Sequence, residues 1–254
     1  MRIADKFNEL NRRDEGAMIA YVCAGDGDTP GIVHTLVNAG ADIVELGLPF
    51  SDPVAEGPTI QASIQRALNN GMNTDKYFAM VKDLDVNIPL LVMTYYNLIF
   101  KRGLKKFTAD CRDSGITGII VPDLSMEESG ELEECCIDNE IDLIYLVTPV
   151  TKGERLDSII SRSSGFIYLV SRLGVTGARD DVAISTKELI NRVKTDIPKA
   201  VGFGISSREQ AVEIRKGGAD GIIVGSALVN IIGSGHDVTN RLDALVRQIK
   251  SGLK

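Results

Sequence analysis

The sequence predicts one α/β domain over residues 1–254, folded as a (β/α)8 barrel of parallel strands. Its 254 residues are 44% hydrophobic and 25% charged, and one barrel of about 250 residues fits this length without linkers. Short β-rich runs alternate with helix-like segments, which favours parallel βα units over hairpins. A helix end, a glycine and a strand start also recur together at residues 38–44, 114–120 and 216–223.

The elements can be taken in order from the N-terminus. Ile3, Phe7 and Leu10 recur at helical spacing and predict an extra N-terminal helix that covers the bottom of the barrel. After the first strand, a helix over residues 30–38 is expected to stop at Gly40. The eight predicted strands are residues 17–22, 42–46, 89–95, 118–121, 142–147, 166–170, 200–203 and 221–224.

The helices fill the gaps between these strands, with an additional one near residues 74–84. Patterns of the Ser/Thr-x-x-Glu type predict capping boxes at four helix starts, at residues 125–128, 151–154, 185–188 and 206–209. With eight βα units, a closed TIM barrel is the simplest architecture. An open doubly wound sheet could use similar elements, but it usually needs a glycine-rich dinucleotide turn, and no G-x-G-x-x-G follows the first strand.

The composition excludes several classes of partner. The net charge is −7 and no long basic run occurs, so nucleic acid is a poor partner. No apolar run reaches the roughly 18 residues of a membrane span, and the charged residues 1–13 lack the core of a signal peptide. We expect a cytoplasmic protein with reduced thiols and no metal site. Its four cysteines are Cys23, Cys111, Cys135 and Cys136.

Residues 43–61, which read IVELGLPFSDPVAEGPTIQ, form the most informative stretch of the chain. A short apolar strand carries Glu45 inside it, where a carboxylate is costly unless it has partners or a function. A loop follows with a second acid, Glu56, and Pro58 marks the start of a helix. One acid at a strand end and another on the following loop is the layout of a site at the C-terminal face of a barrel.

This stretch resembles the signature of the tryptophan synthase alpha subunit family, E-L-G-x-P-F-S-D-P-x-A-D-G-P-T-I-Q. The resemblance extends over nearly the whole chain, with Glu56 where the family usually has Asp. It implies retro-aldol cleavage of indole-3-glycerol phosphate to indole and glyceraldehyde 3-phosphate. It also implies that Glu45 is the catalytic acid/base and that Glu56 holds the indole nitrogen. Without the resemblance, Glu45 could equally be a buried structural acid, and Glu56 a solvated loop acid.

Glycine clusters after the last three strands predict a phosphate site. They lie at residues 174–177, 202–206 and 225–227, and the third opens a short helix over residues 227–232. Glycines let backbone N–H groups approach an anion, and a helix N-terminus adds a favourable dipole. Any one cluster alone could be simple turn chemistry. The resemblance assigns the phosphate to Gly177, Gly204, Gly225 and Ser226.

The resemblance also implies an indole pocket and a mobile loop. It assigns the pocket wall to Tyr21, Met93, Tyr95, Tyr168 and Ile223, for each of which core packing is the competing explanation. Residues 172–181 could close over the substrate as a lid, and a simple surface loop is the alternative. Thr176 is counted among the substrate-binding residues, and Thr176 and Asp52 are candidates for communication with a partner. His34 and His236 lie in no motif and are expected to be surface or structural residues.

The implied partner is a tryptophan synthase beta subunit in an alpha2beta2 assembly. Pyridoxal phosphate is expected only in that partner, so this chain would need no cofactor of its own. Three alternatives remain open: a stand-alone lyase that releases free indole, a weakly catalytic barrel that mainly activates the beta subunit, and another phosphosugar isomerase or aldolase. A Schiff-base aldolase would want a lysine near a strand end inside the barrel, and Lys199 instead precedes the seventh predicted strand.

Overall fold

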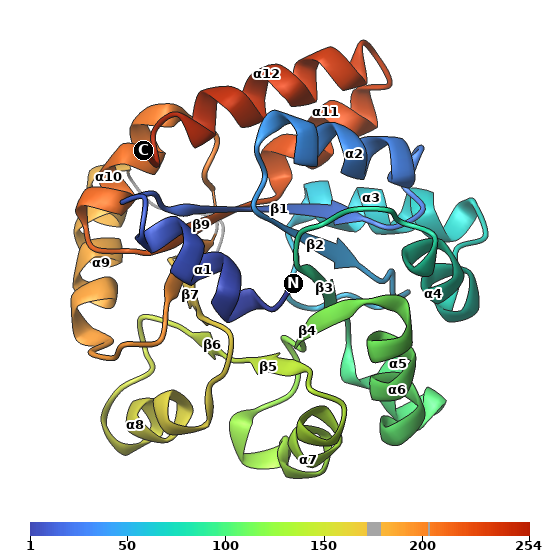
Figure 1. Ribbon diagram of the computed structural model, residues 1–254, viewed down its shortest axis with the longest axis horizontal. Helices are drawn as coiled ribbons and strands as arrows, with labels where there is room; N and C mark the ends of the chain where they lie inside the picture. The colour runs from blue at the N-terminus through green and yellow to red at the C-terminus, as the bar shows by residue number, and fades with distance from the viewer. Residues whose placement is uncertain (172–178, 203) are drawn as a thin grey trace.

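Parallel strands form one sheet that curls into a ring in the computed structural model, with helices around its outside (Figure 1). The structure describes residues 1–171, 179–202 and 204–254, and for residues 179–185 only the backbone. Within these residues the strands are β1 Ala17–Cys23, β2 Ile43–Gly47, β3 Leu90–Met93, β4 Ile116–Ile120, β5 Asp142–Ile144, β6 Leu146–Val147, β7 Ile167–Val170, β8 Lys199–Gly202 and β9 Gly221–Val224.

The ring closes through a bend at Tyr145. The strand order is β5-β4-β3-β2-β1-β9-β8-β7-β6, so β5 and β6 lie at opposite ends of the ladder. Along the chain, however, only Tyr145 separates them. Its carbonyl accepts a hydrogen bond from Tyr168 N at 3.0 Å, which continues the pairing of β6 with β7. The predicted strand 142–147 is therefore one bent strand, and the predicted barrel is confirmed as a nearly closed ring.

Helices follow the strands as the sequence predicted. They are α1 Ile3–Asn11, α2 Thr29–Ala39, α3 Pro58–Asn69, α4 Thr74–Lys82, α5 Tyr96–Arg102, α6 Leu104–Ser114, α7 Gly130–Asp138, α8 Gly153–Arg162, α9 Arg179–Arg192, α10 Arg208–Lys216, α11 Ser226–Ser234 and α12 Val238–Lys250, with a 3-10 turn at Met126–Glu128. The helix α2 ends at Gly40, which has a left-handed backbone. Among the described residues, no helix has the length and hydropathy needed to cross a membrane.

The four predicted capping boxes were wrong in position. A capping box is present at α10, one residue later than predicted. The Ser207 hydroxyl accepts from Gln210 N, and the Gln210 side chain accepts from Ser207 N. The helix α8 begins at Gly153 without a side-chain cap, since the Thr151 hydroxyl accepts from Thr148 N instead. The other two patterns fail for different reasons: residues 125–128 form a 3-10 turn, and position 185 lies within α9.

The inside of the ring is filled by apolar side chains, and α1 covers its N-terminal opening (Figure 1). The ring of Phe7 on α1 lies 5.9 Å from that of Phe166 just before β7, centroid to centroid. This contact confirms the role predicted for the N-terminal helix. The buried interior cluster consists of Ile3, Phe7, Leu10, Ala17, Ile19, Ile43, Leu91, Ile120, Ile144, Phe166, Tyr168, Val170, Ala200 and Ile223.

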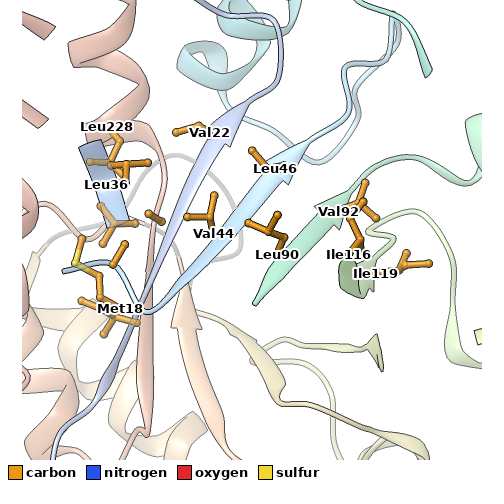
Figure 2. Packing of buried hydrophobic residues seen from close by; sticks show 14 of the residues in the cluster. Met18, Val22, Leu36, Val44, Leu46, Leu90, Val92, Ile116, Ile119 and Leu228 are labelled. Atoms are coloured by element: carbon orange, nitrogen blue, oxygen red, sulfur yellow. The ribbon is translucent and has the colours of Figure 1, made fainter. Parts of the chain in front are cut away.

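A second apolar layer lies between the strands and the surrounding helices. Val44 and Leu46 of β2 point outward and pack in the same cluster as Leu36 of α2 and Leu228 of α11 (Figure 2). Because successive strand side chains point to opposite faces, Ile43, Glu45 and Gly47 must face the inside of the ring. Glu45 therefore places a carboxyl group among the apolar side chains inside the barrel.

A buried ion pair joins the C-terminal helix to the start of β2. Lys250 Nζ lies 2.7 Å from Asp42 Oδ2 and donates to the Gly16 carbonyl at 3.0 Å. The same Asp42 oxygen accepts from Met18 N at 2.8 Å. The C-terminal helix is therefore fastened to the starts of β1 and β2 at the N-terminal face of the barrel, opposite the strand ends that carry the candidate site.

Candidate active site

Glu45 lies at the centre of the candidate site, facing the interior from β2. Its Cα is in register with Tyr21 of β1 and Leu91 of β3. The side chain is 1% exposed, and its Oε2 has no hydrogen-bond partner among the residues that the structure describes. Burial, with a smaller contribution from the charge of Glu56, raises the pKa of Glu45 to about 8. At neutral pH this carboxyl therefore holds a proton that it can donate.

Glu56 is held by a tyrosine from the neighbouring strand end. The Tyr95 hydroxyl donates a hydrogen bond to its carboxylate and accepts from Val54 N and Ala55 N, both at 3.0 Å. Burial raises the pKa of Glu56, and the bond from Tyr95 opposes that rise because it stabilises the charged form. Tyr95 was predicted as a pocket wall; the structure shows in addition that it fixes the loop and the carboxylate of Glu56.

The rings of Tyr21 and Tyr168 lie against glycines of the neighbouring strands. A Cβ on Gly47 would lie 2.5 Å from the Tyr21 hydroxyl, and a Cβ on Gly202 would lie 2.5 Å from that of Tyr168. The missing side chains of these glycines therefore make room for the two rings. Burial, and then the charges of nearby groups that include Glu45, raise the pKa of both tyrosines well above the ordinary value. Both phenols therefore stay protonated beside the carboxyl group of Glu45.

The two remaining predicted pocket residues belong to the top of the interior cluster. Ile223 on β9 is 3% exposed, and the partly buried Met93 at the end of β3 packs against the same cluster. Since both lie near the C-terminal ends of their strands, the structure brings them to the same end of the barrel as Glu45. Both side chains therefore belong to the apolar interior at the end of the barrel where the pocket wall was predicted.

The predicted phosphate site is described at two of its three clusters. Gly204, just after β8, is exposed and has a left-handed backbone with φ of +76°. The first N–H groups of α11, from Ser226 on, have no acceptors within the helix. Gly225, which precedes the helix, has no side chain to cap them. Gly225 also faces Tyr21, whose Cδ1 would lie 3.5 Å from an added Cβ. Thr176 and Gly177 lie outside the described residues.

Sequence reasoning missed two features of this site. It did not identify Gly47 and Gly202 as positions that accommodate tyrosine rings, although both are glycines at inward-facing strand ends. It also did not connect Tyr95 with Glu56, since 39 residues separate them and only the fold places β3 beside β2. The available signal was that Tyr95 lies at the end of β3, the strand that follows the Glu56 loop in the sequence.

A separate cavity of about 390 Å³ lies between the segment that follows β4 and the bent strand at Tyr145. None of the predicted site residues lines it. Within the described residues, no cluster of three or more His, Cys, Asp or Glu side chains could hold a metal ion.

Comparison with known proteins gives one consistent result. The family model described as "Tryptophan synthase alpha chain" matches residues 7–254. The tryptophan synthase alpha chain of Methanosarcina barkeri is 56% identical over 256 residues, which cover 100% of this chain and 97% of that one. The alpha chain of Methanosarcina acetivorans is 57% identical over 255 residues, covering 99% and 94%.

Solved structures agree with the sequence relatives. The tryptophan synthase subunit alpha of Legionella pneumophila is 31% identical with a TM-score of 0.90, covering 99% of this chain and 98% of that one. A chain of M. tuberculosis tryptophan synthase in its aminoacrylate-bound form is 34% identical, also with a TM-score of 0.90, covering 100% and 99%. These matches extend over the barrel and both carboxylates, and this chain belongs to the tryptophan synthase alpha chain family of lyases.

Proposed function

We propose that Glu45 and Glu56 together cleave indole-3-glycerol phosphate to indole and glyceraldehyde 3-phosphate. The observation that carries this assignment is the buried carboxyl of Glu45, with an unpartnered Oε2 among the described residues and a pKa of about 8. A carboxyl of this pKa can both give and take a proton near neutral pH, which a retro-aldol reaction requires of one group.

The proton transfers follow from the chemistry of the substrate. Glu45 donates its proton to C3 of the indole ring, which places positive charge on the ring nitrogen. The carboxylate of Glu56 accepts a hydrogen bond from the ring N–H and stabilises that charge. Ionised Glu45 then removes the proton of the hydroxyl next to the ring, the carbon–carbon bond breaks, and its electrons restore the aromatic indole. Glu45 ends in its starting protonation state, so no cofactor is consumed.

The surrounding residues hold the two ends of the substrate. Tyr21 and Tyr168 provide protonated, buried ring faces beside Glu45, with Met93 and Ile223 completing the wall. The phosphate is bound by N–H groups at Gly204, Gly225 and Ser226. The other two predicted binding residues, Thr176 and Gly177, lie outside the described residues. Support for the helix end is the uncapped first turn of α11, where the helix dipole favours an anion.

The cofactor of the complete synthase is not part of this chemistry. Members of this family need no cofactor, and pyridoxal phosphate belongs to the beta subunit. We propose that this chain docks on a beta subunit in an alpha2beta2 assembly and passes indole to it. Exposed apolar side chains after β2 and β3, Val54 at 79% and Phe100 at 67% exposure, support a docking face at this end of the barrel. Asp52, on the same loop as Val54, is the residue expected to link the two sites.

A cytoplasmic location and action as one domain of residues 1–254 are further parts of this proposal. All four cysteines are free and buried, as is usual in a reducing compartment.

The test is release of indole from indole-3-glycerol phosphate by the purified chain, with and without a beta subunit. Slow release alone that rises strongly with the partner supports a coupled alpha subunit. Fast release that ignores the partner would instead indicate a stand-alone lyase. No release, with the beta subunit still activated, would contradict the catalytic role of Glu45 and leave a binding module.

A further inference from the structure

The helix that follows Glu56 is tied to the loop after β1 by a two-pronged ion pair. Arg66, in the last turn of α3, donates from Nε to Asp26 Oδ1 at 2.7 Å and from Nη2 to Asp26 Oδ2 at 2.8 Å. Asn70, which ends the same helix, donates to the Gly25 carbonyl at 2.9 Å. Parallel guanidinium–carboxylate bonds fix orientation as well as distance.

The loop that receives this helix has little freedom to move. Asp26 is 3% exposed, although its partner guanidinium is partly open to solvent. Gly25 has φ of +92°, and a Cβ on it would lie 2.8 Å from Cβ of Met72. The chain after α3 therefore passes directly over the Gly25 backbone. A shift of α3 would have to break the ion pair and these contacts together.

Arg66 also lies against the helix whose N-terminus is assigned to the phosphate. A Cβ on Gly233, near the end of α11, would lie 2.8 Å from Arg66 Nη2. At the other end of α3, Gln61 Nε2 donates to the Glu56 carbonyl at 2.8 Å. Thus α3 connects the carboxylate loop at its start with α11 and the Asp26 loop at its end.

We propose that Arg66 and Asp26 are positioning residues that set the separation between Glu56 and the phosphate-binding end of α11. This inference depends on the proposed function, in which one substrate spans both places. Neither residue touches the reacting atoms; they act through α3 and α11. A misplacement of about 1 Å remote from the chemistry can cost about a hundredfold in rate, so a modest shift should be measurable.

Arg66→Lys is the direct test, because lysine keeps the positive charge but cannot form the two parallel bonds to Asp26. Binding is measured by calorimetry in the Glu45→Gln background, where the substrate is expected to bind without cleavage. The probes are whole indole-3-glycerol phosphate, free indole and inorganic phosphate. We expect affinity for the whole substrate to fall about tenfold, while each fragment binds within about twofold of the parent. In the otherwise native chain, KM should rise by a similar factor.

Arg162→Lys is the matched control. Arg162 of α8 also pairs with a carboxylate on a neighbouring element, donating from Nε and Nη2 to one oxygen of Glu133 of α7, and within the described residues it makes no hydrogen bond or ion pair with a predicted site residue. It should leave all three affinities and KM unchanged. Asp26→Asn is the second variant, which keeps the volume and one acceptor oxygen and provides the same comparison if the lysine variant folds poorly.

The fragments separate positioning from general damage. If Arg66→Lys and Asp26→Asn bind whole substrate as well as the parent does, or if both weaken the fragments as much as the whole, the inference is wrong. If the native chain neither binds nor cleaves indole-3-glycerol phosphate, it is the proposed function that fails. Because the chain contains no tryptophan, the fluorescence of bound indole can be followed as a second readout.

Discussion

Replacing Glu45 with glutamine should change both activity and the pH dependence of stability. Glutamine keeps the shape of the side chain inside the barrel and cannot exchange a proton. Since general acid–base catalysis contributes about 10²–10⁴ in rate, and this carboxyl performs both transfers, we expect kcat to fall by about three orders of magnitude. The fold should remain, because neighbours of Glu45 such as Leu91 belong to an apolar cluster that does not need the charge.

The stability effect follows from the raised pKa of Glu45. In the unfolded chain this carboxyl titrates near its ordinary value of 4.5, and in the folded barrel at about 8. Between these pH values the folded state binds more protons than the unfolded state, so native stability falls as pH rises. Each pH unit costs about 1.4 kcal/mol, which amounts to about 5 kcal/mol by pH 8. Glu45→Gln lacks this loss entirely.

Urea denaturation followed by far-UV circular dichroism at pH 5, 6.5 and 8 measures the difference. Relative to the native chain, the variant should become steadily more stable across this range, by about 4 kcal/mol between pH 5 and pH 8. Glu154→Gln, an exposed position on α8, is the control and should run parallel to the native chain. If Glu45→Gln also runs parallel, Glu45 is ionised when folded and the assignment of a protonated acid is refuted.

Three further substitutions test the contacts around the site and the buried ion pair at the N-terminal face of the barrel. Tyr95→Phe removes the hydroxyl that holds the Glu56 loop, so KM for indole-3-glycerol phosphate should rise several-fold and the free energy of unfolding should fall by about 1–3 kcal/mol. Gly202→Ala should displace the ring of Tyr168, which lowers kcat/KM and costs about 1–3 kcal/mol in urea denaturation. Lys250→Met leaves Asp42 buried without its cation and should cost about 3–5 kcal/mol while kcat stays unchanged.

Each of these has a control elsewhere in the chain. Tyr77→Phe loses a buried hydrogen bond to the Leu46 carbonyl behind β2, so it should lower stability and leave KM alone. Gly130→Ala adds a Cβ that meets nothing within 4 Å and should be tolerated. Lys216→Met removes an exposed lysine of α10 with little effect on stability. A Tyr95→Phe variant with native KM would contradict its assigned role.

The barrel itself was predictable because its signals are local and repeated. Alternation of apolar runs with helices located all eight strands, and Ile3, Phe7 and Leu10 predicted the helix that closes the bottom. Boundaries were less predictable, because a bend such as that at Tyr145 depends on pairing with two different neighbours. Capping positions also failed, because one-residue shifts in where a helix begins depend on tertiary contacts rather than on the pattern.

For the candidate site, the sequence indicated which residues to consider but not their contacts. The motif over residues 43–61 singled out Glu45, because a carboxylate inside an apolar strand is visible in sequence, and Glu56 on the loop after it. The connection of Glu56 with Tyr95 depends on strand order, and that of Arg66 with Asp26 joins residues 40 positions apart. A single sequence does not show such pairs, because nothing local distinguishes these side chains from other polar ones.

The protonation state of Glu45 is the most direct test of this account. Carboxyl ¹³C chemical shifts of the glutamates would be followed by NMR from pH 4 to 10, and the Glu45 signal assigned by its loss in Glu45→Gln. The account predicts that this signal titrates with a midpoint near pH 8, with the carboxyl protonated at pH 7. A midpoint near the ordinary value of 4.5 would mean that Glu45 is ionised in the resting barrel, which would contradict its proposed role as the proton donor to indole.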